Sequence, residues 1–133
     1  MIAYITVGTS DLNRAAGFYD ALLAEFGASR MFETERMIAW TKPGGTTLVV
    51  TYPHDGEASS PGNGSMAGLA VDSPDDVHKI HDRALALGAS SEGEPGLRQG
   101  GFYGAYFRDL DGNKFSVFNL VGDLPGTVRE NKK

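Results

Sequence analysis

Apolar residues in the stretch 12–26 recur every three or four positions, which is the spacing of an amphipathic helix. The positions on this apolar face are Leu12, Ala16, Tyr19, Leu23 and Phe26. Ser10 or Asp11 can cap the helix N-terminus by accepting hydrogen bonds from free backbone N–H groups. Gly27 follows the last apolar position, where a helix commonly ends. We therefore predict one helix here, packed on a sheet through its apolar face.

Short segments with strand character surround this predicted helix. They alternate apolar and polar residues or are rich in β-branched and aromatic ones, and they cover residues 2–8, 28–32, 37–41 and 46–52. A Lys-Pro-Gly-Gly turn at 42–45 separates the last two. The first part of the chain is therefore predicted to have the order strand, helix, strand, strand, strand.

The same order begins again after residues 53–65, whose Gly, Pro and Ser content is typical of a linker. Residues 66–71 predict a strand. Ser73 followed by Pro74 and two acidic residues predicts the start of a second helix. The apolar positions of this helix are Val77, Ile80, Ala84 and Leu87. Gly88 follows them and is expected to end it.

A Gly-rich stretch at 93–101 leads into two predicted strands within residues 102–120, joined by a turn at 109–113. The tripeptide Gly-Ala-Ser occurs at 27–29 and again at 88–90, which supports an internal repeat. The pattern therefore predicts an α+β fold made of two tandem βαβββ modules.

Composition narrows the class of protein. A chain of 133 residues with 41% hydrophobic and 22% charged residues is expected to form one globular domain. The net charge of −5 argues against a nucleic-acid partner, which needs a dense basic surface. No apolar run is long enough to predict a membrane span, and the N-terminal residues do not have the pattern of a signal peptide. The sequence contains no cysteine, so it predicts no disulfide. We expect a cytoplasmic protein with no membrane partner.

Two motifs resemble those of a known superfamily. The first is V-x-T/S-D-L…F-Y, present as Val7, Ser10-Asp11-Leu12 and Phe18-Tyr19, and the second is the R-D-x-D-G-N-K turn at 108–114. Together with the repeat, they resemble the vicinal oxygen chelate superfamily of glyoxalase I, bleomycin-resistance proteins and extradiol dioxygenases. The resemblance implies curved mixed sheets around a central cavity, and a homodimer. It divides the chain into module one at 1–53, a linker at 54–65, module two at 66–122 and a tail at 123–133.

The resemblance also implies where a divalent metal would bind. Many relatives use His, Glu or Gln from four equivalent strands, and these places fall on Tyr4, Val49, Met66 and Ser116 in this chain. Divalent ions of this kind prefer imidazole and carboxylate donors, which none of the four supplies. We therefore predict a protein without a metal site of this type and assign no cofactor.

The histidines offer two weaker alternatives. His78 and His81 lie three residues apart on the second predicted helix beside Asp82 and could bind an ion, although a solvated helix flank is the preferred interpretation. His54 lies in the linker, where simple exposure is again preferred over a role at the cavity.

The cavity lining implied by the resemblance is amphipathic. We assign eight residues to ligand binding: Tyr4, Thr6, Trp40, Val49, Met66, Arg98, Tyr106 and Ser116. For Trp40, no motif in its strand fixes the register, so the face on which it lies stays open. Arg98 lies in the Gly-rich stretch and could close over an anionic group, the alternative being a plain surface residue. The alternative for the others is that they fill a small core.

We therefore expect a metal-independent glyoxalase/bleomycin-resistance-type protein that binds a small, partly apolar molecule, with or without turnover. The alternative is a glyoxalase-type lyase or isomerase that uses a metal or the acid–base chemistry of Tyr106, Tyr4 or His54. A third possibility is an interaction domain whose cavity has collapsed. No catalytic residue is assigned, because the sequence contains no evident nucleophile with an adjacent base.

Overall fold

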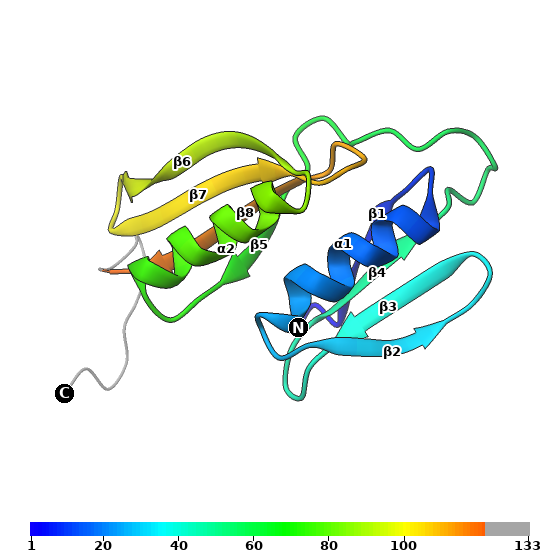
Figure 1. The fold of residues 1–133 in the computed structure, drawn as a ribbon, viewed down its shortest axis with the longest axis horizontal. Helices are drawn as coiled ribbons and strands as arrows, with labels where there is room; N and C mark the ends of the chain where they lie inside the picture. Colours follow the sequence, from blue (N-terminus) through cyan, green and yellow to red (C-terminus); the bar gives the residue numbers. More distant parts are fainter. Residues whose placement is uncertain (122–133) are drawn as a thin grey trace.

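The computed structural model describes residues 1–121, so the tail predicted at 123–133 lies outside the described residues. The first half of the chain contains β1 (Tyr4–Gly8), α1 (Leu12–Ala24), β2 (Ser29–Glu33), β3 (Met37–Thr41) and β4 (Thr47–Thr51). The second half contains β5 (Ala67–Ala70), α2 (Pro74–Ala86), β6 (Ser90–Arg98), β7 (Phe102–Arg108) and β8 (Lys114–Leu120). The predicted pair of βαβββ modules is confirmed (Figure 1).

Each module forms its own four-stranded mixed sheet. The strand orders are β1-β4-β3-β2 and β5-β8-β7-β6, with the outer strands β1 and β5 parallel to β4 and β8 and the other pairs antiparallel. The α+β fold is therefore as predicted, but the two sheets do not close around a central cavity within one chain. β6 occupies most of the predicted Gly-rich stretch, and its register against β7 shifts on both sides of Gly93.

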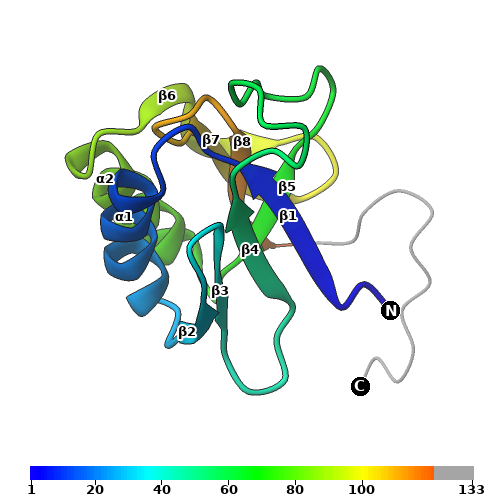
Figure 2. The ribbon, with the colours of Figure 1, turned by 90° about the vertical axis from the view of Figure 1, so that its right-hand side faces the viewer.

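The predicted caps start both helices. The side chain of Asp11 accepts a hydrogen bond from the backbone N–H of Arg14 (3.0 Å), and Ser73 accepts one from Asp76 (3.1 Å). α1 and α2 contact each other and lie on the same side of the two sheets (Figures 1 and 2). Each sheet therefore has one face covered by helices and one face that no helix covers.

The apolar faces of both helices enter one core that runs through both modules. The ring of Tyr19 on α1 lies 5.5 Å from Trp40 on β3 and 6.1 Å from Phe115 on β8, measured between centroids. Phe107 and Phe115 stack beside them at 5.6 Å. Burying each such side chain contributes roughly 1.5–3 kcal/mol. The modules are therefore held together by shared packing as well as by the linker.

One histidine differs from the expectation of a solvated flank. His81 is completely buried, because α2 turns it toward β6, where its Nε2 lies 3.1 Å from Ser91 Oγ. His78 is exposed and lies 2.6 Å from the hydroxyl of Tyr103, and His54 is exposed in the linker. The two helical histidines therefore occupy different environments and do not form a shared ion site.

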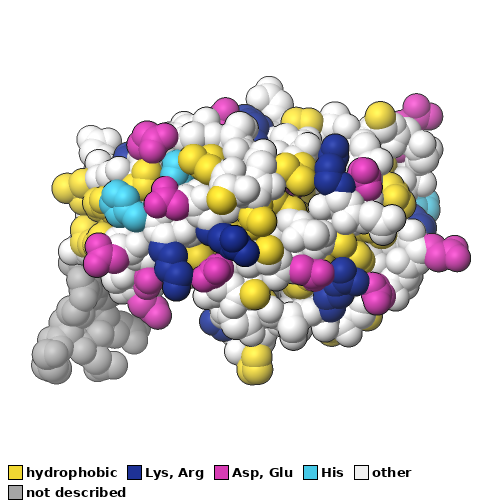
Figure 3. Space-filling model, in the orientation of Figure 1, with side chains coloured by type: hydrophobic (Ala, Val, Ile, Leu, Met, Phe, Trp, Pro, Cys, Tyr) yellow, Lys and Arg dark blue, Asp and Glu magenta, His cyan; other side chains and the backbone are white. Residues whose placement is uncertain are grey.

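The helix-bearing surface carries intermingled acidic and basic side chains (Figure 3). Lys79 and Arg83 on α2 both lie within ion-pair distance of Glu25 at the end of α1. Neither helix of the described chain is long and apolar enough to cross a bilayer.

Candidate functional site

The helix-free face of the first sheet contains a shallow hollow of about 460 Å³. Strand alternation places Tyr4 and Thr6 of β1 on this face, while Ile5 and Val7 point toward the helices. Thr6 lies opposite Val49 of β4 in the sheet register. The other lining residues are Ala3, Met31, Phe32, Met37, Thr47 and Thr51. The wall is therefore made of apolar and hydroxyl groups without a charged side chain.

The helix-free face of the second sheet brings three predicted site residues together. Tyr106 on β7 lies directly opposite Ser116 on β8. The guanidinium carbon of Arg98 lies over the ring of Tyr106, 5.5 Å from its centroid. Further along the same face, Phe102 and Phe118 stack with their centroids 5.1 Å apart. This face therefore combines aromatic surface with a cation, while Ser116 itself is only 2% exposed.

Two glycines allow these side chains to lie close to the sheet. A Cβ at Gly93 would lie 2.9 Å from the Tyr106 ring and 3.3 Å from Arg98 Nη2. A Cβ at Gly68 would lie 3.2 Å from both Ser116 Oγ and the Phe118 ring. The absence of side chains at these positions therefore lets the side chains of the neighbouring strands pack directly over the backbone.

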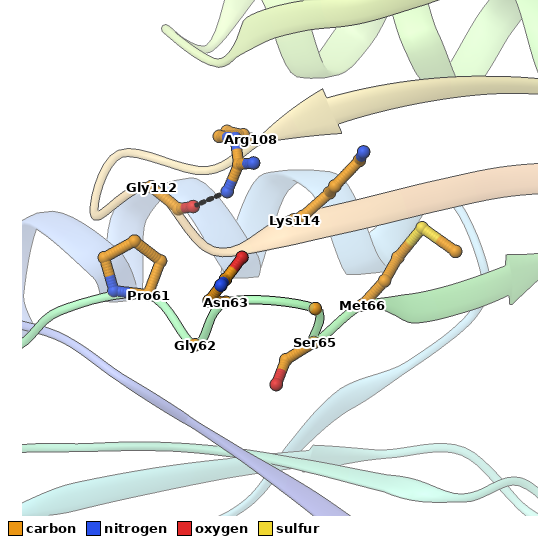
Figure 4. A pocket seen from close by; sticks show the side chains of 9 residues that line it. Pro61, Gly62, Asn63, Ser65, Met66, Arg108, Gly112 and Lys114 are labelled. Atoms are coloured by element: carbon orange, nitrogen blue, oxygen red, sulfur yellow. Dashed lines mark hydrogen bonds between the residues drawn. The ribbon is translucent and has the colours of Figure 1, made fainter.

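Met66 lies at the edge of the same sheet, in a separate hollow of about 660 Å³. Residues 61–65 of the linker form one side of this hollow, and Arg108 and Lys114 of the closing hairpin form another (Figure 4). Arg108 donates a hydrogen bond to the carbonyl of Gly112 (2.8 Å) and lies 3.3 Å from a Glu92 carboxylate oxygen. The hollow is therefore more polar and more cationic than the one on the first sheet.

The predicted site residues thus lie on two different faces. Tyr4, Met66 and Ser116 do not meet in one hollow within a single chain, because the two sheets do not face each other. The expectation for Trp40 is corrected. Its side chain is 1% exposed, points toward α1 and donates from Nε1 to Asp20 (2.9 Å), so it belongs to the core.

The four positions at which relatives hold a divalent metal do not fit such an ion. Val49 offers only hydrocarbon, Met66 a thioether, and Tyr4 and Ser116 hydroxyl groups. Among the residues that the structure describes, no three His, Asp or Glu side chains are grouped so that they could hold a metal ion elsewhere. We therefore derive no chemical step through a metal.

The acidic residues of the hairpin turn have a role that the sequence did not reveal. Asp111 accepts hydrogen bonds from the hydroxyl of Thr9 (2.6 Å) and the backbone N–H of Ser10 (3.0 Å), both in the first module. Asn113 donates from Nδ2 to the carbonyl of Gly8 (2.8 Å). The two sequence motifs therefore contact each other, and the turn fixes the position of module two on module one.

Lys114 was also missed as a site residue. It lies two positions before Ser116 on β8, so strand alternation alone places it on the same helix-free face. Its Nζ lies 5.4 Å from the centroid of the Tyr106 ring. The alternation of side chains along this strand was therefore enough to place Lys114 on the face of Ser116 from the sequence alone.

The family model for the Glyoxalase/Bleomycin resistance protein/Dioxygenase superfamily matches residues 1–117, which is most of the chain. The chain belongs to this superfamily. No curated protein is significantly similar to it.

Several solved structures share the fold. A glyoxalase/bleomycin resistance protein from Albidiferax ferrireducens is 34% identical, with a TM-score of 0.81 over 90% of this chain and 98% of that one. A hypothetical protein from S. aureus is 26% identical, with a TM-score of 0.73 over 90% and 92% of the two chains. A genomically encoded fosfomycin resistance protein from Listeria monocytogenes, 19% identical, has a TM-score of 0.68 over 90% and 92% and shares the fold alone.

Proposed function

We propose that this chain is a metal-independent member of the superfamily that binds a small, partly apolar molecule on the helix-free faces of its sheets. The observation that carries the proposal is the composition of those faces. They present aromatic, thioether and hydroxyl groups at the positions where relatives hold a metal. Such a surface suits a molecule held by apolar contact and a few hydrogen bonds. A cytoplasmic location, expected from the sequence, is part of the same proposal.

We propose further that the protein acts as a homodimer. Large apolar side chains on the first sheet are open to solvent, with Tyr4 64%, Met31 60% and Phe32 43% exposed. Apolar groups gathered on one face are typical of a surface that another protein covers. If the first sheet of one copy faced the second sheet of another, Tyr4 would lie across a shared hollow from Met66 and Ser116. Stable interfaces of this type bury roughly 1,600 Å² in total.

A glyoxalase-type lyase or isomerase is the alternative, and the geometry supports it less. Tyr106 and Tyr4 make no hydrogen bond to a side-chain base within residues 1–121, and His54 is exposed in the linker. General acid–base catalysis needs the proton donor and acceptor within hydrogen-bond reach of the substrate. We therefore place binding before turnover in the proposal.

Two measurements test the proposal. The purified protein is titrated with the neutral fluorescent probe N-phenyl-1-naphthylamine, and saturable binding is expected. It is also melted in the presence of Mg²⁺, Mn²⁺, Ni²⁺ or Zn²⁺. An ion that binds only the folded state raises the free energy of unfolding by roughly 2.7 kcal/mol at a hundred times its Kd. We expect no such increase. A clear increase with an equimolar bound ion, or no saturable probe binding, contradicts the proposal.

A further inference from the structure

We propose that the molecule bound on the second module carries an anionic group, and that Lys114 and Arg98 recognise this group. The inference rests on the proposed function, because it names the class of molecule held on one of the two faces. It predicts an organic anion with an apolar body, such as an aromatic carboxylate or sulfonate.

Two cationic groups converge on one aromatic ring of this face. Lys114 comes from β8 and Arg98 from the end of β6, the two strands that flank β7 in the sheet. The Lys114 Nζ and the Arg98 guanidinium carbon lie 5.4 Å and 5.5 Å from the centroid of the Tyr106 ring. An anion placed beside this ring would therefore contact cations contributed from both sides.

Neither cation has a carboxylate partner within residues 1–121, and both are partly buried. The cations of the described ion pairs are Arg14, Arg30, Lys79, Arg83 and Arg108. Within the described part of the chain, Arg98 donates only to the backbone carbonyl of Glu94 (2.7 Å). The chain has 17 acidic and 12 basic residues, so acidic partners are in excess. Arg36 and Lys42 also lack an ion-pair partner among residues 1–121, but both are exposed.

This arrangement favours a ligand that brings its own negative charge. Removing a cation from water without a counter-ion is unfavourable, and a charge-assisted hydrogen bond to an anion compensates for that cost. Arg108, the cross-strand neighbour of Lys114, is already paired with Glu92. Among the described residues, the two cations at Tyr106 are therefore the partly buried ones that have no carboxylate partner.

The apolar part of the ligand is indicated by the other end of the face. Phe102 and Phe118 stack nearly parallel there, with an interplanar angle of 13°. Phe118 lies two positions beyond Ser116 on β8, on the same face of the strand. A flat apolar body could lie on these rings while its charged group reaches Lys114.

A matched pair of fluorescent probes tests the inference. 8-Anilino-1-naphthalenesulfonate carries a sulfonate, and N-phenyl-1-naphthylamine has the same ring system without it. Both are titrated into the full-length protein and the Kd values are compared at low and high salt. We expect the sulfonate probe to bind about tenfold more tightly at low salt, since a hydrogen bond to a charged group contributes roughly 1.5–3 kcal/mol. This advantage should shrink as salt screens the charges.

Variants assign the effect to the two cations. Lys114→Gln and Arg98→Gln should each weaken sulfonate binding about threefold, and together about tenfold, and leave the Kd of the neutral probe unchanged, whereas the charge-retaining Lys114→Arg should keep most of the affinity. Lys42→Gln, which removes an exposed lysine on the β3–β4 loop, is the matched control and should change neither Kd. Circular dichroism melts confirm that each variant folds.

The outcomes separate this inference from the proposed function. Equal binding of both probes, or sulfonate binding that survives loss of both cations, overturns the anion inference and leaves the binding proposal standing. If Lys42→Gln weakens sulfonate binding as much as the other two substitutions do, the anion inference is also overturned, because general attraction to positive charge would then explain the preference for the sulfonate probe. If neither probe binds, both proposals fall.

Discussion

The hydroxyl of Tyr19, on α1 in the first module, donates a hydrogen bond to the carboxylate of Asp109, in the hairpin turn of the second. The same carboxylate accepts the backbone N–H groups of Asp111 and Asn113, both at 2.9 Å, and the Asn113 side-chain amide at 3.0 Å. Asp109 is only 7% exposed. This carboxylate therefore links the modules and orders the turn that precedes β8, the strand that carries Lys114 and Ser116.

Removing the Tyr19 hydroxyl should weaken the link between the modules. In Tyr19→Phe the buried Asp109 carboxylate loses one donor, and we expect the free energy of unfolding in urea to fall by about 1–3 kcal/mol. Tyr103→Phe is the matched control, since its hydroxyl contacts exposed His78. The control should lose less than about 1 kcal/mol. Equal losses of unfolding free energy in both variants would mean that the hydrogen bond to Asp109 contributes no more to stability than the exposed one to His78.

The same pair predicts a loss of stability at alkaline pH. Burial, and then the charge of Asp109, raise the pKa of Tyr19 well above its ordinary value of 10.0. The folded state therefore holds this proton more tightly than the unfolded state. The contribution of the Tyr19–Asp109 hydrogen bond to the free energy of unfolding is complete below the pKa that Tyr19 has in the unfolded chain, and it is lost as the pH rises toward the pKa in the folded chain. Urea titrations above pH 10 should show the advantage of the native protein over Tyr19→Phe shrinking. If the difference in unfolding free energy between the native protein and Tyr19→Phe stays constant up to the highest pH at which the protein folds, the raised pKa of Tyr19 is contradicted.

The element order, the helix caps and the repeat could be predicted because they depend on local patterns. Asp11 and Ser73 cap their helices, and Gly27 and Gly88 follow them with positive φ values of 79° and 108°, as spacing and residue type predicted. Such signals involve residues a few positions apart. They do not depend on how the two sheets are arranged.

The errors arise where the answer depends on packing between elements. Trp40 belongs to a run of three buried residues on β3, so its strand shows no alternation from which a face could be read. His81 lies on a helix flank that β6 covers, and only the tertiary fold reveals this. The division of Tyr4, Met66 and Ser116 between two faces depends on how the modules join. Lys114, by contrast, could have been found by applying alternation to charged residues as well as to apolar ones.

Displacing Tyr106 and Arg98 on the helix-free face of the second sheet should impair binding more than stability. In Gly93→Ala the new Cβ would press on the Tyr106 ring and on Arg98, which must both move. We expect the Kd of the sulfonate probe to rise several-fold, with a change in unfolding free energy of about 1 kcal/mol or less. Gly17→Ala on α1 is the control, because a Cβ there has no neighbour within 4 Å. It should stabilise by roughly 0.5–1 kcal/mol and leave the Kd unchanged.

A charge on the open face of the first sheet should disrupt the proposed homodimer. Met31 is 60% exposed and lines the hollow beside Tyr4, so Met31→Glu leaves the core of the single chain intact but places a carboxylate in the proposed interface. Sedimentation velocity should show a dimer for the native chain and a monomer for this variant. Ala24→Glu, on the exposed end of α1, controls for added charge and should remain dimeric. A native monomer, or a Met31→Glu dimer of undiminished affinity, would mean that this face does not join two copies, and the shared hollow would then have to be abandoned.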